Sequence, residues 1–251
     1  MKAWKLAAAD SVSAVFRLLA PLRGNPGCRV LMYHAVGSEV SGDRQGQYRI
    51  DAGRFRDHMH CLAESGRQPV AHLGDGIGAG AGLAITFDDG YLDTLTVAAP
   101  IMVDLGFPFT VFVTPDFVRS GEGRYLSPTA LRDLAAQQGV TIGAHGNSHR
   151  RLTECGDAEL THELAGSRAW LEDALSRPVT TMSYPHGAVD DRVRAATAAA
   201  GYMLAACSRF GAHRQNDDRL LIARTDIWAQ DDTTRLMAKV SGAWDWMGWH
   251  R

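Results

Sequence analysis

The chain has 251 residues, with 26 Lys and Arg against 28 Asp and Glu, so its formal net charge is −2. This near-balance excludes a polycationic nucleic-acid binder and an acidic disordered tail, and 45% hydrophobic residues are typical of a globular chain. The four cysteines form no C-x-x-C pair, which predicts buried thiols rather than a disulfide framework or a thiolate zinc site.

The first 30 residues are basic, with five Lys and Arg against one Asp, and their apolar residues fall on one helical face. Asp10 and Arg17 interrupt the apolar run, which is therefore too short for a membrane span of about 20 apolar residues. No clear signal-peptide core is present, so we expect a cytoplasmic protein. Residues 1–22 form either an amphipathic anchor in peripheral contact with the membrane or a helix packed on the domain.

Beyond this extension, assigned to residues 1–28, short β-prone runs alternate with helical segments along residues 29–251. Strands are predicted at 29–33, 83–87, 109–113, 140–144, 179–183, 202–206 and 221–227. Helices are predicted near 52–65, 92–105, 128–138, 158–175 and 189–200. This alternation predicts one α/β domain with a parallel sheet that closes, or nearly closes, into a barrel. Its chemistry would then sit at the carboxyl ends of the strands.

The first strand ends at Tyr33 and His34. A lone histidine is more often structural than catalytic. The position of His34 at a strand end nevertheless makes it a candidate proton donor on the face where the chemistry gathers.

The second strand runs into Asp88, Asp89 and Gly90. Adjacent carboxylates repel each other, so the pair needs a cation or a shared proton. A metal would hold one carboxylate and leave the other free as a base. The alternative is a strand-end turn with two solvated acids.

Two imidazoles four residues apart, His145 and His149, directly follow the strand at 140–144. Together with Asp89 they make a set of two histidines and one carboxylate with open positions for water and substrate. Gly146 stands where a zincin helix would carry its glutamate, so that base is missing.

The segment Ser183-Tyr184-Pro185-His186-Gly187 follows the next strand. Its proline and glycine indicate a tight loop, in which a backbone N–H can point at a developing oxyanion. Such loops are common, and the segment alone predicts no specific activity.

In this order, the T-F-D-D-G, H-x-x-x-H and Y-P-x-G motifs resemble the polysaccharide deacetylase family, also called the NodB-homology or carbohydrate esterase family 4 domain. The resemblance runs from about Arg29 to Ile227. It implies a distorted (β/α)7 barrel, a divalent metal (zinc first; cobalt, nickel or iron also fit) and removal of an acyl group, usually acetyl, from the nitrogen of an amino sugar. It assigns the base to Asp88, the metal ligands to Asp89, His145 and His149, and the oxyanion contact to the backbone at Tyr184.

The sequence departs from the family pattern at three places. Gly146 removes a hydroxyl beside the first metal histidine, and Ser183 stands where an arginine commonly steadies the base, so Arg224 is a candidate substitute. No Leu-x-His motif follows residue 200, but a permuted branch of the family begins with a strand ending in Tyr-His. The resemblance to that branch assigns the general acid to His34.

The sequence leaves the substrate open among a nucleotide sugar, a lipid-linked glycan and a polymer, and formyl could replace acetyl. Its candidate substrate-binding residues are Tyr33, Pro185, His186, Gly187 and Arg224. A non-catalytic carbohydrate-binding relative is the alternative function. An iron oxygenase and a phosphate receiver fit less well, since the first is normally all-β and the second needs no histidines. The tail at 244–249 contains Trp244, Trp246 and Trp249 and is expected to cap the barrel, rather than to stack on a sugar or meet a membrane.

Overall fold

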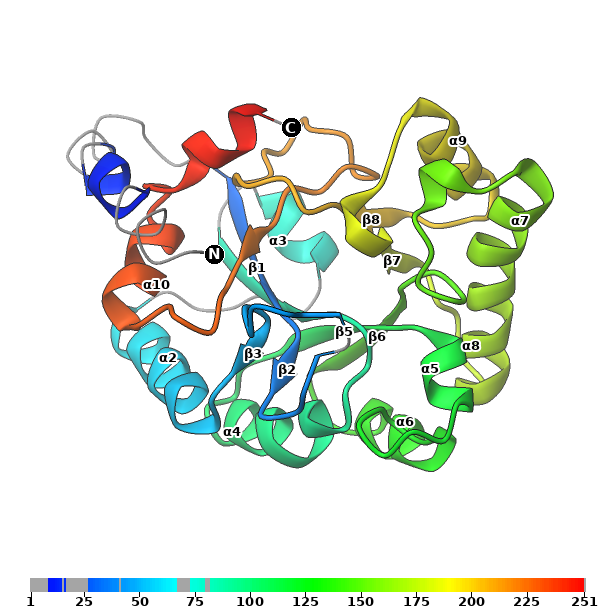
Figure 1. Ribbon diagram of the computed structural model, residues 1–251, viewed down its shortest axis with the longest axis horizontal. Helices are drawn as coiled ribbons and strands as arrows, with labels where there is room; N and C mark the ends of the chain where they lie inside the picture. The colour runs from blue at the N-terminus through cyan, green and yellow to red at the C-terminus, as the bar shows by residue number, and fades with distance from the viewer. Residues whose placement is uncertain are drawn as a thin grey trace.

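The computed structural model describes residues 9–14, 16, 27–40, 42–66, 73–79 and 82–250 (Figure 1). At its centre lies a curled sheet of seven strands in which every neighbouring pair is parallel. In sheet order the strands are β8 (Leu204–Ala206), β7 (Thr181–Ser183), β6 (Val140–Ala144), β5 (Phe109–Val113), β4 (Gly82–Phe87), β1 (Cys28–Tyr33) and β9 (Thr225–Asp226). This confirms the α/β class and the seven-stranded barrel architecture.

The last predicted strand, 221–227, joins the two edges of the sheet. Ile222 forms an isolated parallel bridge with Ala206 at the end of β8. A few residues later β9 pairs with β1, Thr225 lying opposite Leu31. One short segment therefore supplies one edge strand, β9, and bridges the other, β8. Arg224 lies between these two contacts.

Helices flank the curled sheet (Figure 1). They are α2 (Ala52–Glu64), α3 (Leu73–Ala79), α4 (Ala99–Asp104), α5 (Pro115–Arg119), α6 (Pro128–Ala135), α7 (Asp157–Thr161), α8 (Ser167–Leu175), α9 (Asp191–Ala199) and α10 (Thr233–Val240). Side chains at the N-caps of four of them, Asp51, Ser127, Asp190 and Asp232, accept backbone N–H bonds that the first turn leaves free. A small two-stranded sheet, β2 (Ala35–Val36) and β3 (Arg49–Ile50), follows β1.

Two of the predicted helices contain a π-helical turn. The predicted helix at 158–175 is α7 and α8 joined by a π turn at His162–Gly166, and the one at 92–105 is a π turn at Thr94–Ala98 followed by α4. Such turns insert one residue into the helical repeat and are frequent near functional sites. The apolar spacing that predicted these helices is too coarse to reveal the insertion.

The core explains why the strands were recognisable in the sequence. Every residue of β1 and of β5 is buried, since helices cover the outside of the sheet and side chains fill its inside. One large cluster contains Leu31, Ile85, Phe87, Val111 and Ile142. All four cysteines are free, and three of them, Cys28, Cys155 and Cys207, are buried.

The described part of the N-terminal extension packs on the C-terminal tail. Asp10 forms an ion pair with Arg235 at 2.8 Å, and the indole of Trp246 donates to Ser13 at 3.1 Å. Trp244 is buried in a cluster with Ala9, Phe210 and Trp228, so this part of the tail packs on the domain. Residues 9–14 and 16 therefore lie on the domain, while the rest of the anchor predicted at 1–22 falls outside the described residues. Within the described ranges, no helix has the length and hydropathy that a membrane span requires.

Candidate active site

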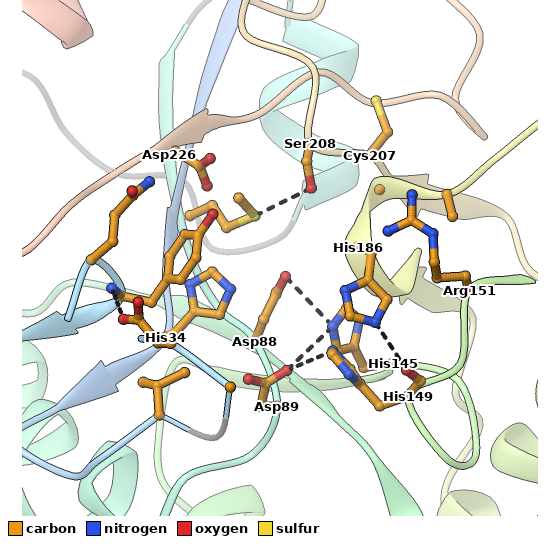
Figure 2. Close-up of a pocket in the computed structure, with 18 of the residues that line it drawn as sticks. His34, Asp88, Asp89, His145, His149, Arg151, His186, Cys207, Ser208 and Asp226 are labelled. Carbon is orange, nitrogen blue, oxygen red and sulfur yellow. Dashed lines mark hydrogen bonds and ion pairs between the residues drawn. The ribbon is translucent and has the colours of Figure 1, made fainter. Parts of the chain in front are cut away.

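A pocket of about 1010 Å³ opens at the carboxyl ends of the strands (Figure 2). Its lining includes His34, Asp88, Asp89, His145 and His149. His34 follows β1, the aspartates follow β4, and His145 follows β6, so strand-end motifs far apart in sequence meet on one face. The expectation that these residues gather at one end of the barrel therefore holds in the structure.

Asp89, His145 and His149 form a compact set of metal-ligand atoms. The Oδ1 atom of Asp89 lies 3.2 Å from His149 Nε2 and 3.4 Å from His145 Nε2, and the three ligand atoms are all within 4.8 Å of one another. His145 Nδ1 lies 2.9 Å from the Ser183 carbonyl oxygen, and as a donor there it leaves Nε2 free as a ligand. The set fits one divalent ion that accepts nitrogen and carboxylate ligands.

The charges of this set favour a cation. Burial acts to raise the pKa of Asp89, but the imidazoles of His145 and His149 hold the pKa of that carboxyl well below its usual range. Burial acts to lower the pKa of His145, but the carboxylates of Asp88 and Asp89 raise it above its ordinary value. An ionised carboxylate is the form that binds a metal, so Asp89 needs no further change to act as a ligand.

The backbone is strained around the pocket. Four described residues other than glycine have positive φ, and three of them line the pocket: Asp89 at 76°, His149 at 62° and His186 at 58°. Each such conformation costs about 1 kcal/mol or more and persists only where the surrounding structure imposes it. Strain concentrated in one pocket is typical of a functional site.

Asp88, which precedes the ligand Asp89, has a different partner. Arg224 binds it through two hydrogen bonds, Nη1 to Oδ1 at 2.7 Å and Nη2 to Oδ2 at 2.8 Å, and Ser183 Oγ donates to Oδ2 at 3.2 Å. Burial acts to raise the pKa of Asp88, but the Arg224 guanidinium brings it below the ordinary value. Arg224 thus occupies the base-steadying position that the sequence suggested. It is fully buried, so its assignment as a substrate contact is wrong.

A glutamate that the sequence analysis did not identify holds the loop with the metal histidines. Glu163, 2% exposed on the π turn, accepts from Asn147 N at 2.8 Å and Ser148 N at 3.0 Å and also binds Ser148 Oγ. Gly146 has φ of 65°, and a Cβ there would lie 2.9 Å from Glu163 Oε2 and 3.0 Å from Pro185. The glycine is therefore required by the packing of Glu163. The only signal in the sequence is that Glu163 lies three residues after Leu160, on the apolar side of the predicted helix.

Three other expectations need correction. The Tyr184 N–H donates to Ala206 O at 2.9 Å within the sheet, so it is not free to hold an oxyanion. Tyr33 is 1% exposed, and its hydroxyl lies 3.2 Å from His58 Nδ1 in the core rather than facing substrate. Pro185 is buried and lies outside the pocket lining. Each of these residues follows or ends a strand, and local sequence does not show which of its groups the sheet uses.

His34, His186 and Gly187 do line the pocket. The ring of His34 packs against that of Tyr48, with centroids 4.5 Å apart. In the turn after β7, Gly187 N–H donates to Tyr184 O, which leaves His186 N–H without a backbone acceptor among the described residues. Figure 2 places His34 and His186 on opposite sides of Asp88 and Asp89.

The profile of the polysaccharide deacetylase family matches residues 78–205, a stretch that contains Asp88, Asp89, His145 and His149. The chain belongs to the polysaccharide deacetylase family. A curated relative from Bacillus subtilis (strain 168), named "Putative polysaccharide deacetylase YxkH", is 24% identical over 205 residues, which cover 79% of this chain and 70% of that protein.

Solved structures of polysaccharide deacetylases share the fold. The Streptococcus pyogenes deacetylase PplD in complex with acetate superposes with a TM-score of 0.76 and 20% identity, covering 85% of this chain and 98% of that one. BC0361, a polysaccharide deacetylase from Bacillus cereus, gives a TM-score of 0.73 and 22% identity, covering 85% of this chain and 69% of that one. At this identity the likeness shows the (β/α)7 barrel fold alone.

Proposed function

We propose that this protein is a metal-dependent N-deacylase that removes an acyl group, acetyl in the first instance, from an amino sugar in a glycan, glycolipid or nucleotide-sugar precursor. One observation carries the proposal: the carboxylate of Asp88, held ionised by Arg224, lies beside the metal-ligand set of Asp89, His145 and His149. Membership of the polysaccharide deacetylase family supports it.

The residues fit a divalent ion, for which zinc is the first candidate and cobalt, nickel or iron are alternatives. Bound there, the ion would supply a Lewis acid that polarises the acyl carbonyl and lowers the pKa of a coordinated water towards about 7. Asp89, His145 and His149 would hold it, and the remaining chemistry belongs to other residues of the pocket.

Asp88 is positioned to accept a proton from the attacking water, because Arg224 and Ser183 keep its carboxylate ionised and oriented. The water oxygen adds to the acyl carbon as Asp88 takes the proton, which gives a tetrahedral oxyanion, and the C–N bond of the amide breaks as that oxyanion collapses. His34, across the pocket, is assigned to give a proton to the leaving sugar nitrogen. The free N–H of His186 replaces that of Tyr184 as the candidate oxyanion donor.

The proposal is tested by elemental analysis together with an acetate-release assay. We expect about one transition metal per wild-type chain and none in His149→Ala, with acetate released from N-acetylglucosamine oligosaccharides or sugar nucleotides by wild type only. Wild-type protein that takes up no metal after zinc, cobalt or nickel is offered would contradict the proposal and favour a sugar-binding relative.

A further inference from the structure

Three arginines line the solvent side of the pocket. Arg44 lies on the loop between β2 and β3, Arg151 follows the metal histidines, and Arg209 follows β8. All three are exposed, whereas Asp88 and Asp89 at the base are buried. Figure 2 shows the Arg151 guanidinium beside His186, directed into the pocket. Positive charge therefore gathers at the mouth of this pocket although the whole chain has a net charge of −2.

Four acids also line the pocket, and they offset the three arginines only in part. Asp88 is paired with the buried Arg224, and Asp89 belongs to the metal set. Asp43 accepts from the backbone of its own loop, including Tyr48 N at 2.7 Å. Asp43 and Asp226 each keep a negative charge, because the Lys239 ammonium binds only the backbone carbonyl of Asp226 and forms its ion pair with Asp231. Three arginines and a divalent ion would still outweigh Asp43, Asp89 and Asp226. With a divalent ion in place, the pocket would present a net positive potential to a substrate.

The partners of the arginines leave them available. Arg151 forms a weak exposed pair with Glu154 at 3.2 Å, with side chains 52% and 69% exposed. Neither Arg44 nor Arg209 has an ion pair with any described acidic residue. Guanidinium groups bind phosphate and carboxylate in a bidentate manner, so such a rim suits a ligand with either group.

The size of the pocket agrees with a substrate larger than one sugar ring. Its volume of about 1010 Å³ leaves room beyond the acylated ring for a phosphate-bearing or carboxylate-bearing group. A neutral polymer would gain little from the arginines and would become cationic as it lost acyl groups, so the same rim would repel the product.

We propose that the acyl amino sugar bound by this pocket is anionic, with a phosphate, pyrophosphate or carboxylate close to the acylated ring. The inference rests on the proposed deacylase function and specifies its substrate class. Arg44 and Arg209 would bind the anionic group at the mouth while the acyl group lies over Asp88 and Asp89.

The test compares three substrates of the metal-loaded protein. UDP-N-acetylglucosamine offers a pyrophosphate, N-acetylmuramic acid a carboxylate, and triacetylchitotriose no charge. We expect kcat/KM for one of the two anionic substrates to exceed that for the neutral trisaccharide about tenfold or more, and to fall severalfold between low and high salt because the charges are exposed. The anionic substrate with the higher kcat/KM shows whether the pocket prefers a pyrophosphate or a carboxylate.

Arginine variants show which residues cause the preference for an anionic substrate. Arg44→Gln and Arg209→Gln should each lower kcat/KM for the anionic substrate about three- to tenfold and change that for the trisaccharide less than twofold. Arg132→Gln, on the exposed face of α6 away from the pocket, is the matched control and should change neither. Equal use of the trisaccharide, without salt dependence, would overturn the inference and leave the deacylase function intact.

Calorimetric titration of the same three ligands separates the two proposals if no acetate is released. In that case the deacylase function fails. The anion inference is then supported by binding of an anionic ligand that the Arg44→Gln/Arg209→Gln double variant loses. It is overturned if wild type and the double variant bind all three ligands alike.

Discussion

Adjacent aspartates have different surroundings in this site. Asp88 faces Arg224 and Ser183, whereas Asp89 faces the two imidazoles. The positive φ of Asp89, 76°, turns the chain between them, and Gly90 continues in the same region at 81°. Two carboxylates that would repel each other in an extended strand are thereby turned towards different partners.

The division of roles predicts opposite metal contents for two substitutions. Asp88→Asn should lower turnover by a factor of about 10²–10⁴ and keep the metal, because it removes the proton acceptor but none of the three metal ligands. Asp89→Asn should lose both the metal and turnover, because it removes a metal ligand. Elemental analysis and acetate release on the purified variants check this. Near wild-type turnover in Asp88→Asn would remove the base assignment.

Arg224 is predicted to matter for stability as well as for turnover. Arg224→Met leaves the Asp88 carboxylate buried and unpaired, which should lower the free energy of unfolding by about 3–5 kcal/mol in urea at neutral pH. The double variant Arg224→Met/Asp88→Asn removes both charges and should regain part of that loss. A single variant as stable as wild type would show that the pair contributes nothing.

The pH dependence of this effect has a definite sign. The pKa of Asp88 is lower in the folded protein than its ordinary value, so the pair stabilises the fold above about pH 4. The stabilisation is lost as the pH falls through the lower folded value. The difference in stability between wild type and Arg224→Met should therefore shrink in acid. A difference that grew on acidification would contradict the assignment.

Among the elements, the loop at 145–149, which carries two of the candidate metal ligands, is held by the π turn beside it. The inserted turn places Glu163 against the loop, where one carboxylate accepts two backbone N–H groups and a hydroxyl. This contact fixes the backbone between the two histidines, and it does not involve their rings. Outer contacts of this kind commonly set metal affinity.

Replacing Glu163 should therefore weaken the metal without removing a ligand. We expect Glu163→Gln to lower zinc affinity about 10- to 100-fold, since the amide keeps the size but accepts with one oxygen only. Competition with a chromophoric chelator measures the affinity. Asp173→Asn, an exposed acid on the following helix, is the control. Unchanged affinity in Glu163→Gln would show that the loop is held by other contacts.

Gly146 tests the same contact from the opposite side. Gly146→Ala should lower the free energy of unfolding by more than Gly106→Ala, because both positions have φ near 65° but only Gly146 lacks space for a Cβ. Backbone strain costs about 1 kcal/mol at each, and the close approach to Glu163 adds to it at Gly146 alone. Urea denaturation of the pair isolates the steric part. Equal losses would mean that Glu163 moves aside freely.

In the whole molecule, the candidate metal site joins the end of β4 to the loop after β6. A ligand that binds only the folded chain stabilises it by about 2.7 kcal/mol at one hundred times its Kd. Added zinc should therefore raise the Tm of the chelator-treated protein by about 5–10 °C, the range expected for a domain of this size. Thermal unfolding followed by circular dichroism measures the shift. His149→Ala should show none, and an equal shift in that variant would place the zinc elsewhere.

Much of this fold was predictable from local sequence. β1, β4, β5 and β6 match their predicted strands to within one residue, because strands covered on both faces read as continuous apolar runs. β7 and β8 begin two residues later than predicted, and β9 is a short part of its predicted strand. The β-propensity of a segment shows that its backbone can adopt a strand conformation. Pairing with the neighbouring strand decides which of its residues form the hydrogen-bonded ladder.

The sequence by itself determined the α/β class, the strand-end motifs and the residues Asp88, Asp89, His145 and His149, because each depends on short-range patterns. Tertiary structure decided the rest. Arg224 binds a carboxylate 136 residues away only because the final strand closes the barrel, and Glu163 reaches the metal loop only through a π turn. The sheet uses the N–H of Tyr184 for pairing, whereas that of His186 has no backbone acceptor in the part of the chain that the structure describes. These contacts depend on strand order, closure and helix register, which no local pattern encodes.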